Sequence, residues 1–124
     1  MNGIDFIADT NALLYVMKKN PCIKPFLKFS FGISIITEME LLSFKSITKD
    51  EENLTRRLIA KCKNFSLSND IKERAISLRR SYGTKLPDAI VAATAIELGV
   101  PLITADKGFN KIAELDLRLI EPQI

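Results

Sequence analysis

Four acidic residues, Asp9, Glu40, Asp88 and Asp106, are far apart in the sequence but share one setting, the first turn of an expected helix. The chain has no histidine, which excludes Ser–His and Cys–His nucleophile pairs and the usual zinc site. Carboxylate oxygens without histidine or cysteine neighbours suit the hard cations Mg²⁺ and Mn²⁺. Such an ion polarises a phosphoryl oxygen and lowers the pKa of an attacking water, so these residues indicate cleavage of a phosphodiester.

Each of these acids also has an ordinary structural explanation. Thr37 and Glu40 have the spacing of a capping box, and Asp9 and Asp106 are common N-cap residues. Asp88 complements the dipole of its helix. The metal hypothesis depends on convergence, because two carboxylates about 5 Å apart repel by roughly 3 kcal/mol at an effective dielectric constant of 20. Three or four carboxylates in one pocket therefore require a counter-charge, which a divalent cation supplies.

An alternation of strands and helices must position these acids. Buried apolar runs predict strands over residues 4–8, 31–36, 64–67, 101–104 and 117–120. Helical spacing of apolar residues predicts helices over 12–17, 23–28, 37–47, 50–63, 71–82 and 87–98, with a single turn from 106. This alternation favours a parallel sheet covered by helices on both faces. In such a sheet the crossover helices begin at the carboxyl edge of the strands, so we expect all four acids on one rim.

Three local details complete this interpretation. Thr37 is expected to open the 37–47 helix. Either Asn69 or Asp70 is expected to cap the 71–82 helix. The side chains expected to face inward from the 50–63 helix are Leu54, Leu58 and Ile59.

The composition is that of an ordinary soluble globular protein. The chain has 124 residues, 47% of them apolar and 27% charged, which is enough for one domain with a substantial core. The longest apolar run, residues 89–96, is far shorter than the roughly 20 residues of a membrane helix, and no basic lead-in of a secretory signal opens the chain. Two cysteines make no disulfide framework, which favours a reducing cytoplasm. The net charge of +3 permits nucleic-acid binding without establishing it.

Four pieces of the sequence, in this order and spacing, resemble PIN-domain proteins of the VapC toxin type. The pieces are residues 8–11 (ADTN), 34–42 (SIITEMELL), 86–95 (LPDAIVAATA) and 102–106 (LITAD). Any one of them is a weak signal, whereas all four together are specific, and the resemblance covers nearly the whole chain. It implies a three-layer α/β/α sandwich with a central, mostly parallel sheet, in which residues 1–124 form a single PIN domain.

The same resemblance implies an activity and partners. Members of the family are endoribonucleases that depend on a divalent metal, Mg²⁺ or Mn²⁺, and cut single-stranded or structured RNA. VapC-type members of type II toxin–antitoxin systems are held inactive by a small antitoxin and usually form homodimers. The family's catalytic and metal-binding acids match Asp9, Glu40, Asp88 and Asp106, and its supporting polar neighbours match Thr10, Asn11 and Thr104.

Two of the acid assignments stay open. Glu38 competes with Glu40 for the second acid, and only one of them can join the site because they lie two positions apart on a helix. The motif favours Glu40. Asp106 is either a ligand of the first ion or holds a water or a second ion, since the family often has asparagine there.

Other residues expected near this edge of the sheet have either a functional or a structural role. Lys85 and Lys107 are candidates for binding the RNA backbone, and a solvated surface position is the alternative for each. Tyr15 and Phe109 could stack on bases, but their spacing favours the core.

Other functions fit parts of the pattern. A catalytically inactive PIN-like module that only binds proteins is the main alternative, and the intact set of acids argues against it. A phosphotransfer enzyme of the haloacid dehalogenase kind also has an acid after its first strand, but it needs a second aspartate two residues on, where this chain has Asn11. A receiver domain needs an acidic pair before its phosphorylated aspartate, and this chain lacks that pair.

Overall fold

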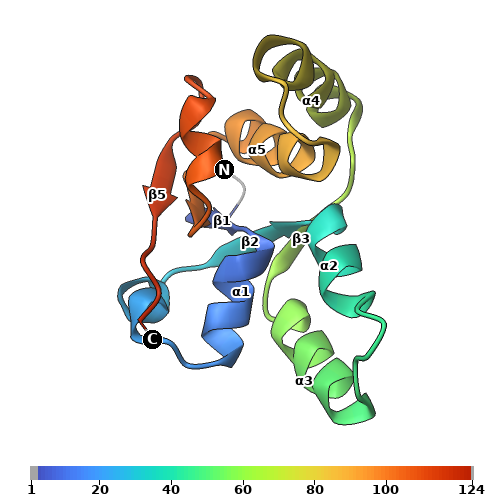
Figure 1. The fold of residues 1–124 in the computed structure, drawn as a ribbon, viewed down its shortest axis with the longest axis vertical. Coiled ribbons are helices and arrows are strands. Elements are labelled where there is room, and N and C mark those ends of the chain that lie inside the picture. The colour runs from blue at the N-terminus through green and yellow to red at the C-terminus, as the bar shows by residue number, and fades with distance from the viewer. Residues whose placement is uncertain (1–2, 124) are drawn as a thin grey trace.

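The computed structural model describes residues 3–123. Within them, five strands form one sheet in the order β3-β2-β1-β4-β5, and all neighbouring strands are parallel (Figure 1). The central strand is β1, whose Ile7 is paired with Gly32 of β2 on one side and Leu102 of β4 on the other. The predicted parallel sheet is confirmed. The strands are β1 Phe6–Ala8, β2 Phe31–Ser34, β3 Lys63–Phe65, β4 Leu102–Thr104 and β5 Leu117–Leu119.

Helices cover both faces of this sheet. Ile7 of β1 is buried in the cluster that α4 and α5 form, whereas its neighbour Ala8 is buried in the cluster that includes α1 and α3. Figure 1 shows α4 and α5 together on one side of the sheet and α1 and α3 on the other. The predicted three-layer α/β/α sandwich is therefore confirmed. The helices are α1 Thr10–Met17, α2 Ile35–Leu42, α3 Lys49–Ala60, α4 Asn69–Tyr82 and α5 Leu86–Leu98, with short 3₁₀ helices η1 Pro21–Phe26 and η2 Lys107–Lys111.

Helix α2 begins earlier than the sequence suggested. Its N-cap is Ser34, whose hydroxyl accepts a hydrogen bond from the Ile36 amide at 3.2 Å. Thr37 therefore lies inside the helix, and its buried hydroxyl has no hydrogen-bond partner within residues 3–123. The predicted capping box of Thr37 and Glu40 is wrong because Ser34 already caps the helix, and Glu40 falls in the second turn. The helix also ends at Leu42 instead of residue 47.

Two details of the following helices also differ from expectation. Ser68, not Asn69 or Asp70, caps α4, since its hydroxyl accepts from the Ile71 amide at 3.2 Å. The inner side of α3 consists of residues four apart, Thr55 and Ile59, which are both buried. Leu54 is 49% exposed, so its predicted inward position is wrong; one position along a helix turns a side chain by about 100°.

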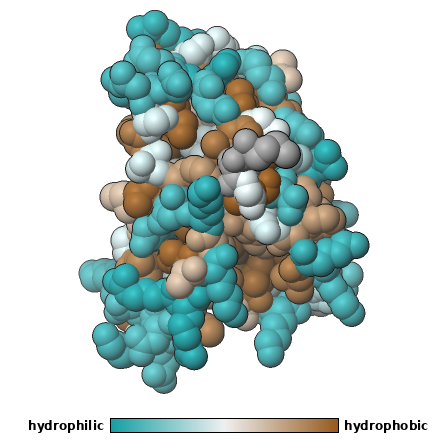
Figure 2. Space-filling view, turned by 180° about the vertical axis from the view of Figure 1, so that it is seen from behind, coloured by the Kyte–Doolittle hydropathy of each residue, from teal (hydrophilic) through white to brown (hydrophobic). Residues whose placement is uncertain are grey.

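The two ends of the molecule are hydrophilic on the face that Figure 2 draws. Figure 2 shows hydrophilic side chains gathered at the top and bottom of one face, with apolar atoms between them. No helix in residues 3–123 is long and apolar enough to cross a membrane. The thiols of Cys22 and Cys62 are both free, in agreement with the absence of a disulfide framework.

Candidate functional site

Asp9 stands at the carboxyl end of the central strand and caps α1. Its side chain is 7% exposed. Its Oδ1 accepts from the Thr10 amide at 2.8 Å, and its Oδ2 accepts from the Thr104 hydroxyl at 2.9 Å and the Asn11 amide group at 3.2 Å. All three donors are neutral, so Asp9 is held firmly in place without being neutralised.

Asn11 joins the ends of two neighbouring strands, β1 and β4. Besides Asp9, its Nδ2 donates to the Thr104 hydroxyl at 3.0 Å, and its Oδ1 accepts from the Ala105 amide at 2.9 Å. The Thr104 hydroxyl also accepts from the Asp106 amide at 3.0 Å. The turn after β1 and the turn after β4 therefore form one hydrogen-bonded unit that contains two of the four acids.

Glu40 reaches the same unit from α2. Its Oε1 accepts from the Thr10 hydroxyl at 2.8 Å, although the two residues are 30 positions apart. Glu38 instead accepts from the Asn64 side chain at 2.6 Å, on β3. Of the two competing glutamates, Glu40 is thus the one that the structure brings to the β1–α1 turn.

Electrostatic coupling links all four acids. Burial, above all, raises the pKa of Asp9 to about 6; hydrogen bonds from the Thr10 amide and the Thr104 hydroxyl oppose this rise, and the Asp88 and Glu40 carboxylates add to it. Burial also raises the pKa of the half-buried Asp88, followed by the charges of Asp106 and Glu40. The charges of the other acids therefore reach Asp9 and Asp88, as expected for side chains on one edge of the sheet.

The donor set of this rim fits a hard divalent cation. It consists of oxygen atoms, and the pKa values of Asp9 and Asp88 are raised chiefly by burial, with neighbouring carboxylates adding to the rise. Within residues 3–123, however, no three acidic or cysteine side chains are arranged to hold one ion among them. Mg²⁺ commonly keeps several waters and binds through only one or two carboxylates, so the residues present fit this ion without a closed protein cage.

The lysines near the rim come from two elements. Lys85 directly precedes α5 and Lys111 ends η2; both are exposed, and both charges lower the pKa of Asp88. Lys107 is also exposed, at the start of η2, but it is not among the charges that act on Asp88. Lys111 was not predicted as a site residue, although it lies in the short turn expected after Asp106. Phe109 is 2% exposed, which confirms its core position.

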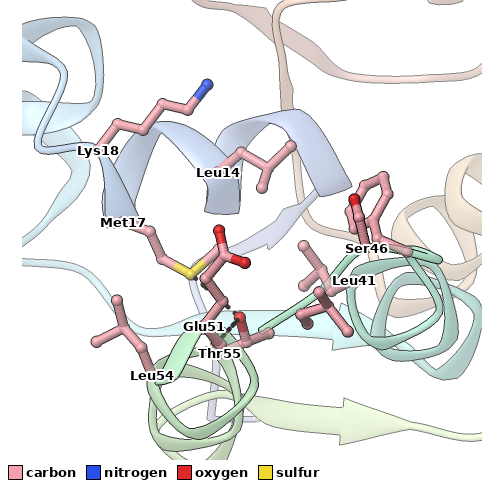
Figure 3. Close-up of a pocket in the computed structure, with 10 residues that line it drawn as sticks. Leu14, Met17, Lys18, Leu41, Ser46, Glu51, Leu54 and Thr55 are labelled. Carbon is pink, nitrogen blue, oxygen red and sulfur yellow. Dashed lines mark hydrogen bonds between the residues drawn. The ribbon is translucent and has the colours of Figure 1, made fainter. Parts of the chain in front are cut away.

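A separate groove of about 340 Å³ lies between α1, α2 and α3 (Figure 3). Leu14 and Met17 line it from α1, Leu41 from α2, and Leu54 and Thr55 from α3. None of the four predicted acids lines it, so this groove is not part of the candidate site. It does account for Leu54, which faces the groove instead of the sheet.

Comparison with known proteins agrees with this architecture. A family model described as the PIN domain matches residues 6–115. The chain is 34% identical to a chain of a toxin–antitoxin complex from Klebsiella pneumoniae, with a TM-score of 0.77, and the match covers 90% of this chain and 95% of that one. None of the curated proteins searched matches this sequence.

Two further solved structures share the fold at lower identity. DNA-bound VapBC from Salmonella typhimurium gives a TM-score of 0.82 at 18% identity, and the match covers 93% of this chain and 97% of that one. VapBC-1 from nontypeable Haemophilus influenzae gives a TM-score of 0.79 at 21% identity, and the match covers 94% and 98% of the two chains. At these identities the similarity concerns the fold.

Proposed function

The chain belongs to the PIN-domain family, and from this membership we propose that it is a divalent-metal-dependent endoribonuclease of the VapC toxin type. One observation carries the proposal, namely that Asp9 is buried with a pKa of about 6 among other carboxylates and neutral donors. Burying a carboxylate beside other carboxylates costs free energy, and a bound cation would offset this cost. Mg²⁺ or Mn²⁺ is that cation.

In this proposal the rim acids Asp9, Glu40, Asp88 and Asp106 hold the ion, one or two of them directly and the others through its bound waters. When bound, the ion polarises the phosphoryl oxygen of the substrate and lowers the pKa of the attacking water. Thr104 and Asn11 fix the Asp9 carboxylate through hydrogen bonds to Oδ2, and Thr10 fixes Glu40. These supporting side chains keep the oxygen atoms pointed toward the ion, as hydrogen-bonded neighbours of metal ligands generally do.

Regulation by a small partner protein belongs to the same proposal. The Klebsiella pneumoniae chain at 34% identity was solved as part of a toxin–antitoxin complex, which supports a cognate antitoxin for this chain. We further propose that residues 1–124 form a single PIN domain that acts as a homodimer in the cytoplasm. Co-purification with the product of a short neighbouring reading frame tests the antitoxin.

RNA cleavage tests the enzymatic part directly. Single-stranded RNA is incubated with the protein in Mg²⁺, in Mn²⁺ and in EDTA, beside Asp9→Asn and Glu40→Gln. We expect metal-dependent cutting by the wild type and a loss of at least ~100-fold in each variant, because even the outer partners of metal ligands matter 10- to 100-fold. Glu38→Gln is the matched control, since Glu38 is on the same helix but bonds to Asn64.

The alternative makes the opposite prediction. If neither the wild type nor Asp9→Asn cuts RNA in any metal, the enzyme proposal is wrong and a catalytically inactive PIN-like binding module is favoured. Equal loss of activity in Glu38→Gln and Glu40→Gln would contradict the assignment of Glu40.

A further inference from the structure

The last turn of α4 contacts the short turn that leads into α5, the helix that carries Asp88. We propose that Arg79, in this last turn of α4, is a positioning residue that sets the place of the Asp88 carboxylate through the backbone ahead of α5. The inference rests on the proposed function, because Asp88 is one of the acids that hold the proposed ion. Arg79 lies outside the four motif pieces of the sequence.

Asp88 differs from the other rim acids because no hydrogen bond within residues 3–123 holds its side chain. Asp9, Glu40 and Asp106 each accept a hydrogen bond from a neighbouring donor. The Asp88 carboxylate has neither a hydrogen bond nor an ion pair in this part of the chain. Its position therefore depends on where the backbone of α5 begins.

Helix α5 begins without a side-chain cap. Its N-cap residue Lys85 makes no capping bond with its side chain, and the Lys85 carbonyl accepts from the Ala89 amide at 2.8 Å. Asp88 lies inside this first hydrogen-bonded turn, directly after Pro87, whose ring fixes the φ angle. The residue ahead of Lys85 thus determines where the first turn, and with it Asp88, lies at the edge of the sheet.

Arg79 holds that preceding residue, Thr84. Its Nε donates to the Thr84 carbonyl at 3.2 Å, and its own carbonyl accepts from the Gly83 amide at 2.9 Å. Thr84 is 3% exposed, and its hydroxyl has no partner within residues 3–123. A carbonyl in such a buried residue costs free energy unless a donor satisfies it. Arg79, although exposed as a residue, supplies that donor from α4.

Substitutions at Arg79 can separate its hydrogen bond from its charge. Glutamine has its amide nitrogen at the same position along the side chain as the arginine Nε, whereas methionine has a methyl group there. Arg79→Gln therefore keeps a donor without the charge, and Arg79→Met removes both. Arginine, glutamine and methionine have similar helix propensities, so α4 itself should be little affected.

Two matched controls come from the same turn of α4. Arg80→Met removes a positive charge at the next position, where the exposed side chain has no hydrogen bond or ion pair within residues 3–123. Tyr82→Phe removes a hydrogen bond from this turn to Glu114, in the segment after η2. The first control tests the charge, and the second tests the loss of any bond at the end of α4.

Mn²⁺ affinity and hydrogen exchange are the two measurements. Affinity is measured by electron paramagnetic resonance, and exchange over residues 83–90 is followed by mass spectrometry in metal-free protein. We expect Arg79→Met to weaken Mn²⁺ binding by about 10-fold, the lower end of the range for outer partners of metal ligands. Exchange at the start of α5 should become faster in the same variant. Arg79→Gln, Arg80→Met and Tyr82→Phe should stay near the wild type in both measurements.

A double-mutant cycle distinguishes positioning of Asp88 from a general effect on the fold. The Arg79→Met substitution is repeated in an Asp88→Asn background. If Arg79 acts on the ion through Asp88, it should cause no further loss of Mn²⁺ affinity there. A further loss as large as that in the wild-type background would overturn the positioning role.

Two other results would also contradict the role of Arg79. If Arg79→Met leaves both exchange and Mn²⁺ affinity unchanged while Asp88→Asn weakens binding, Arg79 is not a positioning residue and the metal site stands. An equal loss of affinity in Arg80→Met would show that charge and not the hydrogen bond is responsible. If the wild type binds no Mn²⁺, the proposed function is wrong, and so is the role of Arg79 toward the ion.

Discussion

The Asp9 carboxylate is held in place by hydrogen bonds, although burial disfavours its charged form. Three neutral donors orient its carboxylate, and burial raises its pKa to about 6. The turn position of this residue was evident from the apolar run that ends at it. The raised pKa could not be predicted from the sequence, because the burial of Asp9 and the approach of Glu40 and Asp88 depend on elements distant in the sequence.

The raised pKa of Asp9 predicts a pH-dependent stability in the absence of metal. The folded protein binds this proton up to about pH 6, whereas the unfolded chain releases it near 3.8. Between these values the native state holds more protons, so the free energy of unfolding falls as pH rises, by about 3 kcal/mol at most. The raised pKa of Asp88 acts in the same direction.

Urea unfolding in EDTA at pH 4 and pH 7 measures this effect. Asp9→Asn removes the titrating group, so its stability should fall less between the two pH values than that of the wild type. The difference between the two proteins isolates Asp9 from the other acids. An equal change in both proteins would show that Asp9 does not carry the raised pKa.

At the scale of elements, α2 shows where sequence patterns mislead. Thr37 and Glu40 have the spacing of a capping box, but Ser34 lies earlier and caps the helix instead. Both residue types are good caps, and the choice depends on where β2 stops pairing with its neighbours. The outcome matters for the site, because Glu40 reaches Thr10 from the second turn of the helix and not from its start.

Two substitutions in α2 test this assignment. Ser34→Ala removes the cap and should lower the free energy of unfolding by about 1 kcal/mol. Thr37→Val removes a buried hydroxyl that has no partner in the described structure, so it should be neutral or stabilising. Urea midpoints of the two variants give the answer. If Thr37→Val lowers the free energy of unfolding and Ser34→Ala leaves it unchanged, Thr37 and not Ser34 caps the helix.

At the scale of the whole molecule, the alternation of strands and helices was enough to predict the parallel sheet and its two covering layers. The rule that helices begin at the carboxyl edge then predicted that distant acids approach one another, as the effects of neighbouring carboxylates on the pKa values of Asp9 and Asp88 indicate. The individual hydrogen bonds between side chains could not be predicted from the sequence. The bond from Thr10 to Glu40, for example, depends on how α1 packs against α2.

Mn²⁺ binding measured by electron paramagnetic resonance tests the central claim, that these acids hold a divalent ion, without relying on any substrate. The wild type should show saturable binding that Asp9→Asn and Asp88→Asn weaken strongly, while Glu38→Gln keeps it. Absence of saturable binding in the wild type, or equal binding in all four proteins, would contradict the account.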